Sequence, residues 1–439
     1  MLRAHGLGGG ADLPIPPELA IAGGAAALVL SFVVLVSAWR RPRFAGPAAE
    51  GSAATEGRTL PRTTAVVDHP ATRWSVRILG AALFLFAATA AVLGQDNLTN
   101  PVFGIVYVWL WVGIVPASLL FGPFYRAISP VRTAHLVLSR ISGNDPGSGV
   151  VRAPRRLGLW PAAVGLFAFV WLELVVPDGT ALATVNLWFT VYLLVTFIGA
   201  SVFGTRWLEQ ADPFEVFSTL VGRLSPWGRS DGGLLVVRNP FRNLAGTPVE
   251  SGLVAVVAVL LGSTAFDSLH SSSGWLSFVQ AAPVDAFVLN SAALLLTCAV
   301  VGAVFALASG FRAGELAHSL VPIIIGYFVA HYLSYFVEVG QQTLIYASDP
   351  LSDGADLFGT RSWEVDYWLS YQVTLLASVK VVAIVAGHVV GAVSAHDRFL
   401  AVLPVGRRVT GQLPLLAVMV LYTFTGLYLL FGGPSAPAQ

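Results

Sequence analysis

The chain has 439 residues, of which 55% are hydrophobic and only 11% are charged, with a mean hydropathy of +0.73. Soluble domains carry about 25% charged residues, so this composition excludes a soluble protein and indicates an integral membrane protein. The formal net charge of +1 argues against a nucleic-acid partner, and the single cysteine, Cys298, excludes a disulfide framework.

Ten apolar segments are each about 20 residues long, the length of helix that crosses about 30 Å of hydrocarbon. Unbroken apolar runs of this kind predict helices rather than a barrel, because a helix satisfies its own backbone hydrogen bonds. The expected fold class is all-α, a polytopic transmembrane bundle in one domain, 19–439, behind an N-terminal segment, 1–18. The expected spans are residues 19–38, 76–94, 102–121, 159–176, 183–203, 249–269, 285–309, 315–339, 368–393 and 412–431.

Arginine is distributed unevenly among the loops between these spans. The loops on one side hold nearly all of it, whereas the loops on the other side hold only Arg3 and Arg361. By the positive-inside rule, the arginine-rich loops are cytoplasmic and both termini are extracytoplasmic, in a multi-pass protein of the cytoplasmic (inner) membrane. The first span ends in Trp39-Arg40-Arg41 and is expected to stay as an anchor rather than to be a cleaved signal peptide.

The cytoplasmic loops contain a linker and two helix start signals. Residues 40–75, rich in Ala, Gly, Pro and Arg, are expected to form a flexible linker. Ser129-Pro130 and Asp212-Pro213 each place a capping side chain before a proline at the first helical position. These signals predict amphipathic helices near residues 129–141 and 212–225, the second lying at the inner membrane surface as a scaffold.

The segment from Glu315 to Glu338 is apolar enough to cross a bilayer, yet it contains His318 and His331. A charged side chain in hydrocarbon costs roughly 2.5–3.5 kcal/mol on insertion scales, so one that is kept there usually faces the bundle interior and has a function. His331 and Glu338 are seven residues apart and therefore share one face of a helix.

Two other spans carry a carboxylate toward the same predicted side of the membrane, Glu173 and Asp267. If these helices are neighbours, His331, Glu338, Asp267 and Glu173 form an outer pocket of one histidine and three acids. Oxygen and imidazole ligands suit a divalent metal such as copper or zinc, or a proton relay. In the alternative interpretation, Glu173 and Asp267 are ordinary residues near helix ends.

Lys380, the only lysine of the chain, lies about 18 Å along its helix from Trp368, close to the middle of the bilayer. It is expected to point into the bundle, either neutral or paired with an acid such as Glu338. It shares its face with a row of small residues that predicts close packing on a neighbouring helix. This row is Ala383, Gly387, Gly391 and Ala395.

Three mechanisms could use these groups. A proton-coupled device or transporter would pass a cation from His331 and Glu338 to inner groups, which would be Lys380, His388, His318, Glu315 and His396. A metal-handling protein would use the outer pocket. A haem protein would need facing axial histidines such as His318 and His388. Because His318 and His331 point about 140° apart, haems stacked along this helix are not favoured.

Several short motifs are spread along the chain: Ala4-His5-Gly6, Asp12-Leu13-Pro14-Ile15-Pro16, Ala347-Ser348-Asp349-Pro350, Gly387-His388, Ala395-His396-Asp397-Arg398 and Gly411-Gln412-Leu413-Pro414. Together they resemble a group of bacterial multi-pass membrane proteins often labelled fenitrothion hydrolase, over nearly the whole chain. The resemblance implies a membrane-bound, metal-dependent hydrolase of organophosphate triesters. In similar members Ala-His-Gly follows a signal-like segment, which implies that His5 could become the first residue and, with its free amino group, chelate copper.

The function expected from the residues is binding or movement of a small cation, a metal ion or a proton, through a polar site in the later helices. The alternatives are the organophosphate hydrolase and an accessory subunit of a membrane respiratory or export complex, which the cytoplasmic helices would suit. The expected partners are the lipid bilayer and the cation, together with a membrane-protein partner or a second copy of this chain.

Overall fold

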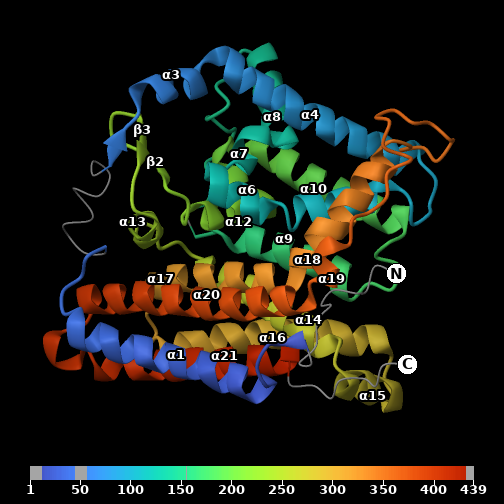
Figure 1. Ribbon diagram of the computed structural model, residues 1–439. Helices are drawn as coiled ribbons and strands as arrows, with labels where there is room; N and C mark the ends of the chain where they lie inside the picture. Colours follow the sequence, from blue (N-terminus) through green and yellow to red (C-terminus); the bar gives the residue numbers. More distant parts are fainter. Residues whose placement is uncertain (1–11, 45–56, 155, 432–439) are drawn as a thin grey trace.

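The computed structural model describes residues 12–44, 57–154 and 156–431 (Figure 1). In this part of the chain, eight helices are long and apolar enough to cross a membrane. They are α1 (Pro17–Ala38), α4 (Pro70–Leu93), α10 (Leu182–Phe203), α14 (Leu253–His270), α16 (Ala286–Ala308), the run Ala313–Ala347, α20 (Val373–Val402) and α21 (Leu413–Phe431) with its preceding turn. The all-α polytopic bundle expected from the sequence is confirmed.

The two remaining expected spans are irregular. One is a pair of helical pieces, Pro101–Leu110 and Ile114–Phe121, bent by 44° at the break between them; joined together they would be a ninth span. The other is α9 (Trp160–Leu174), an apolar helix of 15 residues that is shorter than a full span. All ten apolar segments are therefore helical, but the count of spans by length is eight or nine.

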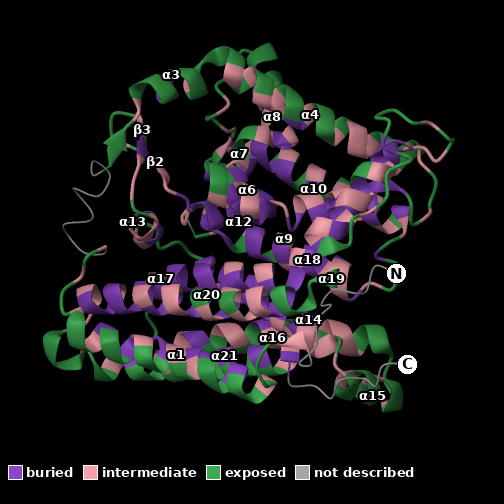
Figure 2. Ribbon diagram, viewed as in Figure 1, coloured by how far each residue is buried: buried purple, intermediate pink, exposed green. Residues whose placement is uncertain are grey.

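The run Ala313–Ala347 is the centre of the bundle. It consists of α17 (Ala313–Leu316), the 3-10 turn η3 (Ala317–Leu320) and α18 (Val321–Ala347). In its apolar window 72% of the residues are buried, against 67% for α14 and 11% for α4. Figure 2 shows the same contrast, with buried residues concentrated on the inner helices and exposed residues on the outer faces of α1, α21 and α4. Ionisable groups on α14 and α18 therefore face protein rather than lipid.

The small-residue row on α20 packs against α18 and η3, as predicted. A Cβ atom on Gly387 would lie 2.6 Å from the carbonyl oxygen of Pro322, and one on Gly391 would lie 2.7 Å from that of Ser319. On the facing helix, a Cβ atom on Gly326 would lie 2.4 Å from the carbonyl oxygen of Ala383. The two helices approach so closely only because both carry glycine at the contact.

The expected flexible linker is partly ordered, and here the sequence-based expectation was wrong. Residues 45–56 lie outside the described part, but β1 (Arg58–Thr59) and α3 (Pro61–Asp68) are formed. With β2 (Trp227–Arg229) and β3 (Leu235–Val237), β1 makes a small antiparallel sheet in the order β1-β3-β2. Arg229 and Arg73 bind Asp68 and hold the pKa of its carboxyl well below the usual range. The linker is thus fixed to a loop more than 150 residues further along the chain.

Helices are formed at both predicted positions, as α8 (Pro130–Ile141) and α12 (Pro213–Gly222), and each is capped by the expected side chain. α8 buries one face and exposes the other. α12 differs from the prediction of a surface helix, because nine of its ten residues are buried against α6 (Ile114–Phe121), α7 (Tyr125–Ile128), α9 and α18. Its polar face can be buried because Arg132 binds Glu215 and Ser118 binds Ser218.

Candidate functional site

The shortest contact between ionisable groups of the central helices joins α14 and α18. His331 Nε2 lies 2.7 Å from Asp267 Oδ2, and the two side chains are only 5% and 6% exposed. Asp267 lies in the last turn of α14, and His331 lies near the middle of the run Ala313–Ala347. An imidazole and a carboxylate in contact inside a membrane bundle can form an ion pair or share a proton.

Glu173 lies beside this pair, in the last turn of α9, which packs on α14. Its carboxylate interacts electrostatically with that of Asp267. Its Oε2 atom is inaccessible to solvent and has no hydrogen-bond partner among the described residues. Glu173 is thus within electrostatic range of Asp267, and Glu173, Asp267 and His331 are called the acid–histidine cluster below.

Three tyrosines lie near the acid–histidine cluster. Tyr332 and Tyr335 follow His331 on α18, and both hydroxyl groups are within electrostatic range of the carboxyl groups of Glu173 and Asp267. The imidazole ring of His331 stands edge-on to the ring of Tyr332, with 4.7 Å between the centroids. These tyrosines were not identified as site residues from the sequence, although their spacing from His331 on one helix could have indicated them.

The third tyrosine, Tyr107, lies in a π-helical segment. After α5 (Pro101–Gly104), residues Ile105–Leu110 form the π-helix η2, in which the amide of Trp111 bonds the carbonyl of Val106 five residues earlier. Such turns are rare and often mark functional sites. Tyr107 donates a hydrogen bond of 2.6 Å to the carbonyl oxygen of Gly179, and the charge of Glu173 acts on its hydroxyl.

Glu338 is not part of the acid–histidine cluster. It lies two turns beyond His331, about 10 Å along α18, and accepts a hydrogen bond from Ser370 of α19 (Trp368–Tyr371). No three His, Cys, Asp or Glu side chains within residues 12–44, 57–154 and 156–431 are placed to hold one metal ion. The expected four-residue metal pocket is therefore not formed in this part of the chain, and His5 lies outside it.

Lys380 is buried at 1% exposure, as expected for a lysine that points into the bundle. Its electrostatic partner is the carboxylate of Asp12, which lies just before α1, rather than Glu338. α1 packs against α20, so the segment that contains Asp12 is held near Lys380, in the first third of α20.

The other residues expected on an ion path are dispersed. His388 lies 2.9 Å, through Nδ1, from its own helix carbonyl at Ile384, and His318 is buried in η3. The Nε2 atoms of both rings are buried without a hydrogen-bond partner in the region that the structure describes. Glu315 is partly exposed and lies 3.6 Å from Arg312.

His396 and Asp397 connect segments that are distant in sequence. His396 lies 2.8 Å from the side-chain oxygen of Gln412 through Nδ1 and 2.9 Å from the carbonyl oxygen of Trp39 through Nε2. Asp397 accepts hydrogen bonds from the backbone amides of Arg43 and Phe44. The motifs that contain these residues therefore join α20 to the start of α21 and to the end of α1.

Comparisons with protein-family models, with curated proteins and with solved structures give no match for this chain. Its function is therefore inferred from the geometry of its own side chains.

Proposed function

We propose that this integral membrane protein binds and moves protons at the acid–histidine cluster. The observation that carries the proposal is the buried contact of 2.7 Å between His331 and Asp267, with a second carboxylate, Glu173, beside it. Ionisable side chains in membrane bundles commonly form proton relays, and histidine changes its charge near neutral pH.

Charge counting supports a proton as the bound cation. If both carboxyl groups of the acid–histidine cluster were ionised, a protonated His331 could offset only one of the two negative charges. An uncompensated charge in a protein interior costs several kcal/mol. We infer that the cluster keeps at least one further dissociable proton, which Glu173 Oε2 can accept without losing an existing hydrogen bond.

The donor set favours a proton over copper or zinc. Structural zinc sites have four protein ligands and catalytic ones three, whereas His331 and Asp267 supply one close nitrogen–oxygen contact. A proton needs only two facing acceptor atoms. The arginine distribution supports a cytoplasmic-membrane location with both termini outside.

Replacing Asp267 with asparagine tests this function. The wild-type protein in liposomes that contain a pH-sensitive dye should dissipate an imposed pH gradient faster than protein-free liposomes. Asp267→Asn should reduce the rate to that of protein-free liposomes, because asparagine cannot take up a proton. The matched control, Asp231→Asn in the exposed loop between β2 and β3, should keep the wild-type rate. A wild-type rate equal to that of protein-free liposomes, or an unchanged rate for Asp267→Asn, would contradict the proposal.

A further inference from the structure

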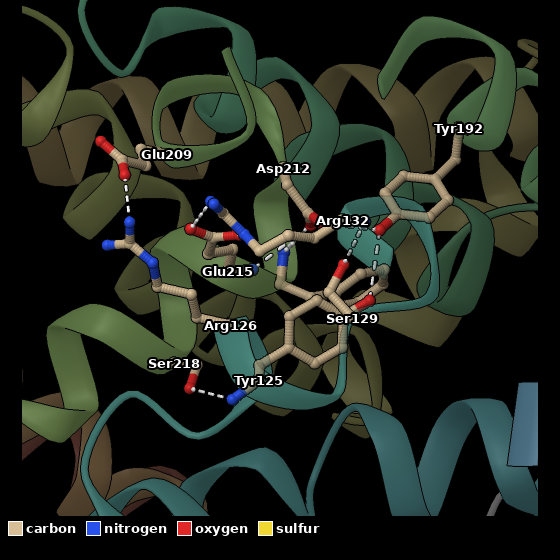
Figure 3. A network of polar contacts seen from close by, with 10 residues as sticks. Tyr125, Arg126, Ser129, Arg132, Tyr192, Glu209, Asp212, Glu215 and Ser218 are labelled. Carbon is tan, nitrogen blue, oxygen red and sulfur yellow. Dashed lines mark hydrogen bonds and ion pairs between the residues drawn. The ribbon is translucent and has the colours of Figure 1, made fainter. Parts of the chain in front are cut away.

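A second buried carboxylate lies at the start of α12 (Figure 3). Asp212 has no exposed surface. Its Oδ1 accepts hydrogen bonds from the amides of Phe214 and Glu215, at 3.0 and 3.3 Å, and its Oδ2 accepts one of 3.0 Å from the hydroxyl of Tyr192. The Tyr192 hydroxyl in turn lies 3.2 Å from that of Tyr125. Asp212 is therefore hydrogen-bonded to a chain of two hydroxyl groups, those of Tyr192 and Tyr125.

The charged groups around Asp212 are paired with one another. Glu215 receives two hydrogen bonds from the guanidinium of Arg132, and Glu209 binds Arg126. The helices α9 and α18, which also pack on α12, present aromatic rings there. The ionisable neighbours, by element, are Tyr125 and Arg126 on α7, Arg132 on α8, Tyr192 on α10, Glu209 on α11 (Arg206–Ala211) and Glu215 on α12.

Burial, followed by the charge of Glu215, raises the pKa of Asp212 to about 7 from its ordinary value of 3.8. The hydrogen bonds from Tyr192 and from the two backbone amides act in the opposite direction. Asp212 can therefore gain or lose a proton close to neutral pH, whereas an exposed aspartate would be fully ionised there.

We propose that Asp212 is a second proton-binding group, an inner site apart from the acid–histidine cluster. Proton binding at Asp212 does not depend on the proposed function. When a proton adds to Oδ2, the new O–H can donate to the Tyr192 hydroxyl, which turns to donate to Tyr125. The Tyr125 hydroxyl, which donates to Tyr192 while Tyr192 donates to Asp212, then turns its own proton away, and the charge of the carboxylate is neutralised.

A polar cavity lies on the segment that precedes this inner site. The cavity has a volume of about 240 Å³, and its wall includes Glu209 and Gln210, three and two residues before Asp212. The other lining residues are Gly147, Thr205, Arg206 and Glu250. Glu209 also forms an ion pair with Arg126, the residue that follows Tyr125 in the chain.

The helix α9 extends from the inner site to the acid–histidine cluster. A Cβ atom on Gly165 would lie 3.2 Å from the ring of Pro213, next to Asp212, and Glu173 follows eight residues later, about 12 Å along the helix. Phe169 lies between them, with its ring 5.0 Å from that of Trp111 and 5.3 Å from that of Phe214. This aromatic layer separates the sites, so each is expected to titrate with little influence from the other.

Proton uptake by the purified protein in detergent tests the inner site. Between pH 8 and pH 6, wild type should take up more protons than Asp212→Asn, by up to one per chain, because asparagine keeps the capping oxygen but cannot be protonated. Asp231→Asn should match wild type. Tyr192→Phe should move the midpoint of uptake to higher pH, because the hydrogen bond that it removes favours the ionised form of Asp212.

The stability of the protein gives a second readout with a defined sign. Because the folded-state pKa of Asp212 is raised above the unfolded value, the folded state binds this proton more strongly, and stability should fall as pH rises from about 4 to about 7. Asp212→Asn should show a smaller fall than Asp231→Asn. Equal uptake and equal pH dependence of stability in these two variants would overturn the inner site. Failure of the proposed function would instead appear as a wild-type gradient-dissipation rate equal to that of protein-free liposomes, with the uptake difference intact.

Discussion

Replacing Arg132 with alanine is expected to destabilise the folded protein by about 3–5 kcal/mol, because it leaves a buried carboxylate without its cation. Arg132 donates two hydrogen bonds to Glu215, and the two side chains are 12% and 2% exposed. Burial already raises the pKa of Glu215, and the charge of Arg132 opposes this effect. Without Arg132, the Glu215 carboxyl must either stay ionised without a cation or take up a proton. Both states cost free energy in the folded protein.

Arg126→Ala is the matched control, since it removes the neighbouring ion pair. Arg126 and Glu209 are 52% and 41% exposed, and exposed pairs contribute about 0–1 kcal/mol. Denaturant unfolding at neutral pH, followed by tryptophan fluorescence, should therefore show a large loss for Arg132→Ala and a small one for Arg126→Ala. Equal losses would contradict a buried ion pair between Arg132 and Glu215.

The second large effect is expected at His331. Replacing it with leucine should destabilise the protein by about 3–5 kcal/mol at neutral pH, because Asp267 is left buried without the imidazole that contacts it. The loss should be seen in the free energy of unfolding, and proton movement should stop as well.

The double variant His331→Leu/Asp267→Leu separates the ion pair from ordinary packing. Replacing both members of a buried pair by apolar residues of similar volume is often neutral or stabilising. The double variant should therefore be more stable than His331→Leu. If the double variant were the less stable of the two, His331 would contribute mainly through its shape and its contact with Tyr332.

The parts of the fold that depend on local pattern could be predicted from the sequence. Apolar runs of about 20 residues located all ten helices, and the spacing of Gly387 and Gly391 predicted the close contact of α20 with α18. The burial of His331 also followed from local pattern, since an ionisable residue in an apolar span is expected to face the interior.

The parts that depend on contacts between distant residues could not be predicted. Glu215 is buried because Arg132 lies 83 residues earlier in the chain, and helical periodicity carries no sign of that partner. Without knowledge of the Arg132 contact, the periodicity of α12 predicts an amphipathic surface helix. In the same way Glu338 was expected beside His331, but Ser370, 32 residues further along the chain, binds it instead.

The infrared absorption of protonated carboxyl groups tests the central claim most directly. The measurement compares Glu173→Gln, Asp267→Asn and Asp231→Asn across pH, each in an Asp212→Asn background so that the inner site does not contribute. A carboxyl band that changes with pH should be present in the Asp231→Asn protein and lost or strongly reduced in the Glu173→Gln and Asp267→Asn proteins. The same band in all three proteins would show that the acid–histidine cluster holds no dissociable proton and would contradict the account.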